Sequence, residues 1–87
     1  MPVSFVAFVI SMAGNAAVHF GDAPDPATKQ KRQPNLDAAG QVIELLSMLE
    51  EKTRGNLTAE ERQPLEQVLY ELRMRYAETR KGSASGA

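Results

Sequence analysis

The side chains that could carry out chemistry are few and scattered along this sequence. One histidine, His19, and no cysteine occur in the 87 residues. Imidazole and thiolate groups are the usual zinc ligands, and they supply many catalytic bases and nucleophiles. Because His19 has no cysteine or carboxylate partner at ligand spacing, we expect no metal, no cofactor and no catalytic residue within one copy. A symmetric pair of His19 side chains, brought together by two copies, remains a minority alternative for a metal or pH-sensitive site.

The charged residues give no sign of an active site either. Adjacent residues on a helix do not face each other, so the acidic pairs at 50–51 and 60–61 are not catalytic dyads. We interpret the basic cluster Lys29–Arg32 as a solvated loop rather than a phosphate-binding patch. The net charge is −1, which gives no electrostatic reason to expect nucleic acid. No phosphate loop or nucleophile elbow occurs. We therefore expect a protein that is not an enzyme and does not bind nucleic acid.

The element that must carry any function is the apolar run SFVAFVISMAGNAAVHF at residues 4–20. Its apolar residues do not alternate and the run is too long for a typical strand, so we predict a helix. Ser4 is the expected N-cap and Gly21 the expected stop. The polar residues recur at steps of four and seven, and so share one stripe of the helix: Ser4, Ser11, Asn15 and His19.

This first helix carries more apolar surface than two partner helices can cover. At about 25 cal/mol per Å², leaving 300 Å² wet would cost about 7 kcal/mol, which rivals the stability of a small domain. We therefore predict a homo-oligomer, preferably a dimer, that forms an intermolecular helical bundle. The residues expected at the oligomer interface are Phe5, Phe8, Val9, Met12, Ala13, Ala16 and Phe20.

Two polar or small residues of the helix bear on that interface. Asn15 would fix the register and oligomer state if it is buried there, and simple surface exposure is an equal alternative. Gly14 costs about 1 kcal/mol in a helix interior relative to Ala, and we expect close packing of another helix to compensate.

Membrane association is the alternative to self-association. The helix would span about 26 Å, which is short of the ~30 Å hydrocarbon core, and Gly, Asn and His interrupt it. It has no tryptophan belt and no basic residue before it. The start of the chain does not read as a secretory signal. We expect a cytoplasmic protein, with a peripheral membrane location as the alternative.

The rest of the chain predicts two more helices, at about 35–54 and 58–80, and so an all-α fold with a single domain over residues 1–81. Asn35 is the expected cap of the second helix, whose apolar face Leu45 and Met48 widen. Thr58 and Glu61 form a capping box for the third. Pro64 either kinks this third helix or starts it. Residues 21–34 form a proline-rich linker, and residues 82–87 a flexible tail.

Several stretches carry a resemblance to a known family. They are FVAF at 5–8, HFGD at 19–22, LLSMLEEKTRGNLT at 45–58 and LYELRMRY at 69–76. Over about residues 5–76 the chain resembles the small bacterial family called domain of unknown function 1844. The resemblance implies an all-helical bacterial protein without an assigned activity, and it transfers no catalytic residue. Pro64 departs from the family pattern, in which a helix former is expected.

These observations together predict a non-enzymatic homo-oligomeric helical bundle. Its role would be that of a structural or protein-interaction module. The expected partner is a second copy of the chain, and an unidentified protein is a further candidate.

Overall fold

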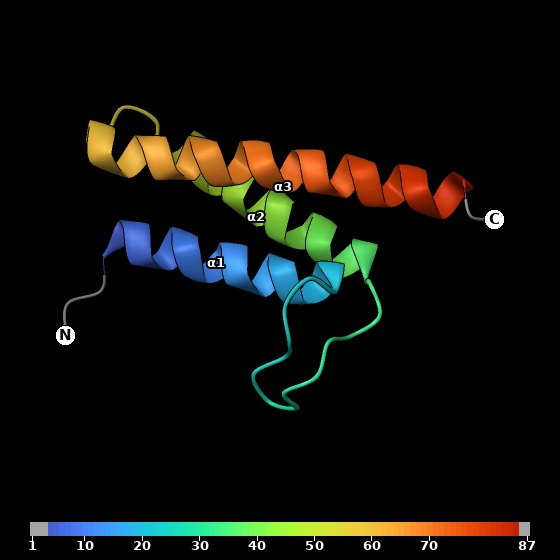
Figure 1. Cartoon of the computed structure of the whole chain (residues 1–87). Helices are drawn as coiled ribbons and strands as arrows, with labels where there is room; N and C mark the ends of the chain where they lie inside the picture. The colour runs from blue at the N-terminus through green and yellow to red at the C-terminus, as the bar shows by residue number, and fades with distance from the viewer. Residues whose placement is uncertain (1–3, 86–87) are drawn as a thin grey trace.

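The computed structural model describes residues 4–85 and places side chains as far as Gly82. It contains three helices, α1 (Phe5–Phe20), α2 (Leu36–Thr53) and α3 (Ala59–Ser85), and no strand among the described residues. The all-α fold predicted from the sequence is therefore confirmed. Each helix packs against the other two. Helices α1 and α3 run in the same direction, and α2 runs in the opposite direction to both (Figure 1).

Local side chains fix both ends of α1 as predicted. The Ser4 hydroxyl accepts a hydrogen bond from the Ala7 amide at 3.0 Å. At the other end Gly21 has φ +80°, and its amide donates to the carbonyls of Ala17 and Val18. A Cβ on Gly21 would lie 2.8 Å from the Arg32 carbonyl oxygen. Glycine is needed here for two reasons, the left-handed backbone and the close approach of the loop.

The starts of α2 and α3 are capped by the residues that the sequence indicated. The Asn35 side chain accepts from the Ala38 amide at 3.1 Å. The Thr58 amide donates to Glu61 Oε1 at 2.9 Å, and the Glu61 amide donates to Thr58 Oγ1 at 3.2 Å. This reciprocal pair is the predicted capping box.

Helix α3 begins at Ala59 and continues through Pro64 without interruption (Figure 1). The alternative in which Pro64 starts the main helix is therefore wrong. The helix tolerates the proline although Pro64 has no amide hydrogen to donate to the Glu60 carbonyl. It also extends to Ser85, beyond the predicted end at 80. The first residues of the segment predicted as a tail thus belong to α3, while residues 86–87 lie outside the described part.

The core draws three buried residues from each helix: Val9, Ala16 and Phe20; Ala39, Val42 and Leu46; Leu65, Leu69 and Leu72. In α2 and α3 they recur at steps of three and four, on the apolar faces expected from the sequence. This core is complete within one chain. The bundle shared between chains stays a prediction, and it could involve only the surface that remains outside this core.

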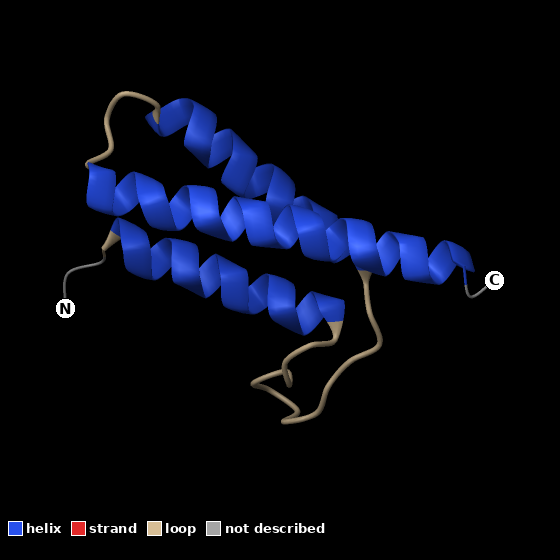
Figure 2. Cartoon of the chain, turned by 45° about the horizontal axis from the view of Figure 1, so that its top comes forward, coloured by secondary structure: helices blue, strands red, loops and turns tan. Residues whose placement is uncertain are grey.

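The connection between α1 and α2, residues 21–34, extends away from the bundle (Figure 2). Its contacts centre on one aspartate, Asp25. Asp25 is buried, and its Oδ1 accepts from the Ala27 amide at 2.8 Å. Its backbone amide donates to the Gln30 carbonyl at 2.9 Å, and its carboxylate pairs with Arg32. The segment is therefore a closed loop with its own polar centre, while Lys29 and Lys31 of the basic cluster are exposed.

Candidate interaction surface

Large apolar side chains remain exposed on the surface of the bundle, and they lie on all three helices: Phe8, Ile10, Leu45, Met48, Tyr70 and Met74. Tyr70 and Met74 are one turn apart on α3. The others belong to α1 and α2. An exposed apolar group is informative when its members adjoin, because scattered ones are ordinary.

Phe8, Leu45 and Met48 adjoin in this way. They line a groove of about 120 Å³ between α1 and α2, and the remaining lining residues are Met12, Leu46 and Leu49. We call this cavity the α1–α2 groove. Its position follows from the core, because Phe8 and Leu45 are the chain neighbours of the buried Val9 and Leu46 and so flank the seam between the two helices. The groove is lined entirely by apolar side chains.

The exposed side of α1 continues this apolar surface. It consists of Ala7, Phe8, Ile10, Ser11, Gly14 and Asn15, all exposed, and we call it the α1 outer face. The sixteen residues of α1 include no Asp, Glu, Lys or Arg. A helix side facing water usually carries such residues. The α1 outer face is thus uncharged, and it meets the groove at Phe8.

The residues predicted as an oligomer interface are divided between the interior and the surface. Val9, Ala16 and Phe20 lie in the core of their own chain, so no second copy can reach them. Phe5 and Met12 are half-buried against that core, Ala13 is half-buried, and Phe8 is exposed. The difference arises because α2 and α3 cover one side of α1. The interface stays a prediction, and the surface open to it includes Ile10, Leu45 and Met48, which the predicted set omitted.

The two polar candidates of α1 have different environments. Asn15 is exposed on the α1 outer face of the single chain. His19 is half-buried, and its Nδ1 is buried without a hydrogen-bond partner among the described residues. The His19 carbonyl accepts from the Asn35 amide at 2.7 Å, which joins the end of α1 to the start of α2. Over residues 4–85, no group of three or more potential His, Cys, Asp or Glu ligands is placed to hold a metal ion.

The family model for domain of unknown function 1844 (DUF1844) matches residues 2–78, nearly the whole chain. The chain belongs to this family. No curated protein and no solved structure matches it.

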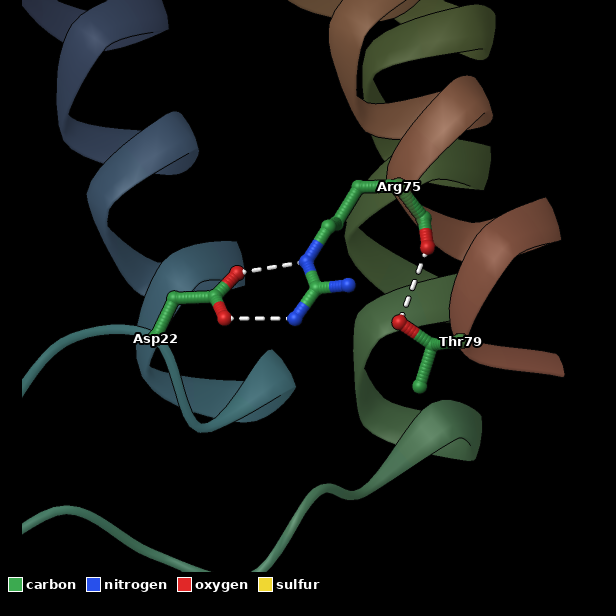
Figure 3. A network of polar contacts seen from close by, with 3 residues as sticks. All are labelled: Asp22, Arg75 and Thr79. Atoms are coloured by element: carbon green, nitrogen blue, oxygen red, sulfur yellow. Dashed lines mark hydrogen bonds and ion pairs between the residues drawn. The ribbon is translucent and has the colours of Figure 1, made fainter. Parts of the chain in front are cut away.

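One polar contact of this DUF1844 chain joins α3 to the end of α1 (Figure 3). Arg75 donates from Nε and Nη2 to the two carboxylate oxygens of Asp22, at 2.7 and 2.6 Å. The guanidinium also lies 5.7 Å from the centroid of the Phe20 ring. The hydrogen bonds from Arg75, with its positive charge, hold the pKa of Asp22 below its ordinary value of 3.8. No pattern in the sequence indicated this pair, because its members are far apart along the chain.

Asp25 and Arg32 make a second pair, inside the loop. The hydrogen bond from the Ala27 amide, followed by the contact with Arg32, lowers the pKa of Asp25 below 3.8. Both carboxylates are therefore ionised at neutral pH and engaged with arginines, which suits roles in holding the loop and the helices together.

Within the described residues, no helix combines the length and the apolar character needed to cross a membrane.

Proposed function

We propose that this protein is a non-enzymatic interaction module that associates with a second copy of itself, and that the α1–α2 groove is its docking surface. The observation that carries the proposal is the convergence of three exposed apolar side chains, Phe8, Leu45 and Met48, on one groove. The cytoplasmic location expected from the sequence is part of the same proposal.

The exposed apolar surface sets the expected strength of association. Phe8, Leu45 and Met48 are 45%, 50% and 50% exposed. Full burial of such a side chain contributes about 1.5–3 kcal/mol, so covering the exposed half of all three contributes about 2–4 kcal/mol per copy. Two copies would then contribute about 4–8 kcal/mol. This only offsets the lower part of the cost of association, about 4–15 kcal/mol. A micromolar dissociation constant corresponds to a net of about −8 kcal/mol, so the micromolar dimer that we expect must also bury apolar surface outside the groove.

The charge distribution favours a second copy as the occupant. A two-fold symmetric interface places each surface patch against the identical patch, so any charge within it faces a like charge. The groove lining and the α1 outer face contain no charged residue. Glu44 adjoins Leu45 and Met48 on α2, is exposed in the single chain, and belongs to neither of these two sets of residues. Self-pairing of the groove lining and the α1 outer face therefore brings no like charges of these residues together.

Two carboxylates that could otherwise act in catalysis are held in ion pairs with arginines, and this supports a role without catalysis. Asp22 pairs with Arg75, and Asp25 pairs with Arg32. These carboxylates serve the fold, and the groove itself offers only apolar side chains.

Sedimentation velocity of the whole chain from about 1 to about 200 µM tests the proposal. We expect a reversible dimer, and we expect Met48→Lys to remain a monomer across that range. Met74→Lys is the matched control, because Met74 is 46% exposed and lies on α3, outside the groove. It should dimerise like the unmodified chain. A monomer throughout the range, or equal loss of association in the two variants, would overturn the proposal.

A further inference from the structure

A second cavity, of about 250 Å³, lies where the end of α2 meets the start of α3. We call it the α2–α3 pocket. It shares no lining residue with the α1–α2 groove, so the proposed self-association does not account for it. Its lining combines charged with apolar side chains, whereas the groove is entirely apolar. Sites for drug-sized ligands usually measure about 300–1,000 Å³, so the α2–α3 pocket suits a smaller molecule.

One carboxylate in the lining of this pocket has no protein partner. Glu50 is half-buried, and its side chain makes no hydrogen bond or ion pair within the described residues. Thr53 also lines the pocket, and its hydroxyl donates to the Leu49 carbonyl at 2.7 Å, so Thr53 Oγ1 can only accept a further hydrogen bond. Both residues belong to the C-terminal turn of α2, where the helix dipole favours a positive charge. This part of the pocket therefore suits an ammonium group.

The two arginines of the lining differ in their engagement. Arg62 and Glu66 are exposed and pair with each other, with Arg62 Nε 3.7 Å from Glu66 Oε1. Arg54 directly follows α2, and its side chain makes no hydrogen bond or ion pair in the part of the chain that the structure describes. Glu50 precedes Arg54 by four positions, yet the two side chains are not paired. The guanidinium of Arg54 is therefore available to a carboxylate, which it can bind through two parallel hydrogen bonds.

Apolar side chains complete the pocket. Leu57 is half-buried and packs against the core, to which Leu65 belongs. An aliphatic group of a ligand placed against this wall would lose its water, and each methylene group buried in this way strengthens binding about fourfold.

We propose that the α2–α3 pocket binds a small zwitterion with an aliphatic side chain, namely a free amino acid such as leucine. Its ammonium group binds Glu50 and Thr53 Oγ1, its carboxylate binds Arg54, and its side chain lies against Leu57. The lining carries two carboxylates and two guanidinium groups, so a ligand with one charge of each sign adds no net charge to it. An amine alone would meet the unpaired charge of Arg54, and a carboxylate alone would meet that of Glu50. The inference is independent of the proposed self-association.

Titration of the isotope-labelled whole chain with L-leucine, followed by two-dimensional NMR, tests the inference. We expect saturable shift changes in residues 50–57, with a dissociation constant on the order of 1 mM. Three probes each lack one feature of leucine: leucinamide the carboxylate, 4-methylpentanoate the amine, and glycine the aliphatic side chain. At constant pH and ionic strength each should bind at least about tenfold more weakly, because a hydrogen bond to a charged group or several buried methylene groups are lost.

Substitutions assign the two ends of the ligand. Glu50→Gln and Arg54→Gln should each raise the dissociation constant of leucine at least about tenfold. Glu51→Gln is the matched control, because Glu51 is the next residue of α2, is exposed and does not line the pocket. It should leave the constant within about twofold.

Three results would overturn the inference: no saturable change up to about 50 mM leucine, equal binding of leucine and the three probes, or equal effects of Glu50→Gln and Glu51→Gln. Leucine binding by a chain that stays monomeric would support the inference and overturn only the proposed self-association.

Discussion

Replacement of Arg75 by alanine should release the end of α1 from α3. The guanidinium makes two hydrogen bonds to Asp22, at 2.7 and 2.6 Å (Figure 3). It also lies over the Phe20 ring. The side chains of Arg75 and Asp22 are 41% and 42% exposed, so water screens the pair. An exposed ion pair contributes about 0.2–1 kcal/mol and an exposed cation–π contact about 0.5–1 kcal/mol. We therefore expect Arg75→Ala to lower the free energy of unfolding by about 1–2 kcal/mol.

Urea unfolding followed by circular dichroism measures this loss at low protein concentration. Arg80→Ala is the matched control, because Arg80 is exposed on the same helix and has no hydrogen bond or ion pair within the described residues. Its effect should stay within about 0.5 kcal/mol. Asp22→Asn, alone and combined with Arg75→Ala, completes a double-mutant cycle that isolates the pair from the ring contact. Equal losses in Arg75→Ala and Arg80→Ala, or strictly additive effects of the Asp22 and Arg75 substitutions, would refute the reasoning.

The pH dependence of stability gives an independent reading of the same pair. Arg75 lowers the pKa of Asp22 in the folded chain below its ordinary value of 3.8. The stabilisation is therefore fully present above that value and is lost as the pH falls through the lower pKa of the folded state. In Arg75→Ala this cause of the shift is removed, so the acid dependence below about pH 4 should become shallower.

Two further predictions concern the loop between α1 and α2. Gly21→Ala and Gly55→Ala both force alanine to a positive φ, but only at Gly21 would the new Cβ meet the Arg32 carbonyl oxygen, at 2.8 Å. Gly21→Ala should therefore lower the free energy of unfolding, measured with urea, more than Gly55→Ala does, and each substitution should cost at least about 1 kcal/mol. Equal losses would show that the loop is not held against the helix end. Asp25 has a lowered pKa because the Ala27 amide and Arg32 bind its carboxylate. The protection factors of the backbone amides in residues 21–34 should accordingly be highest above about pH 4 and should fall relative to those of the helices at lower pH. Asp25→Asn should remove this pH dependence of the protection factors.

The parts of the fold that could be predicted from the sequence are those fixed by neighbouring residues. Ser4 and Asn35 cap helices through amides three residues away, and Gly21 ends α1 by its own backbone conformation. Such contacts leave local signatures, as does the step of three and four that marks Leu65, Leu69 and Leu72 as core. Pro64 was harder because a single missing hydrogen bond competes with the packing of a long helix, and the packing prevails.

The parts that could not be predicted depend on which side of each helix the other helices cover. Arg75 and Asp22 are 53 positions apart, and nothing near either one in the sequence indicates the other. The same limit explains why the residues predicted as an oligomer interface turned out to be divided between the core and the surface. The excess apolar surface of α1 was visible in the sequence, but its division into a buried side with Val9 and an exposed side with Ile10 required the positions of α2 and α3. A signal for the groove did exist, because Leu45 and Met48 widen the apolar face of α2 beyond what one seam needs.

The proposed interaction can be tested by substitution because the groove residues that would contact a second copy are distinct from the residues of the core. The buried cluster includes Val9, Leu46 and Leu69, whereas the groove residues Phe8 and Met48 are about half exposed. Polar substitution in a core destabilises the fold, so loss of association there would say nothing about function. A lysine at Met48 keeps its charge in water in the single chain, and the fold should tolerate it. Its effect would appear only where a second copy removes that water, and association can therefore be abolished while the monomer stays folded.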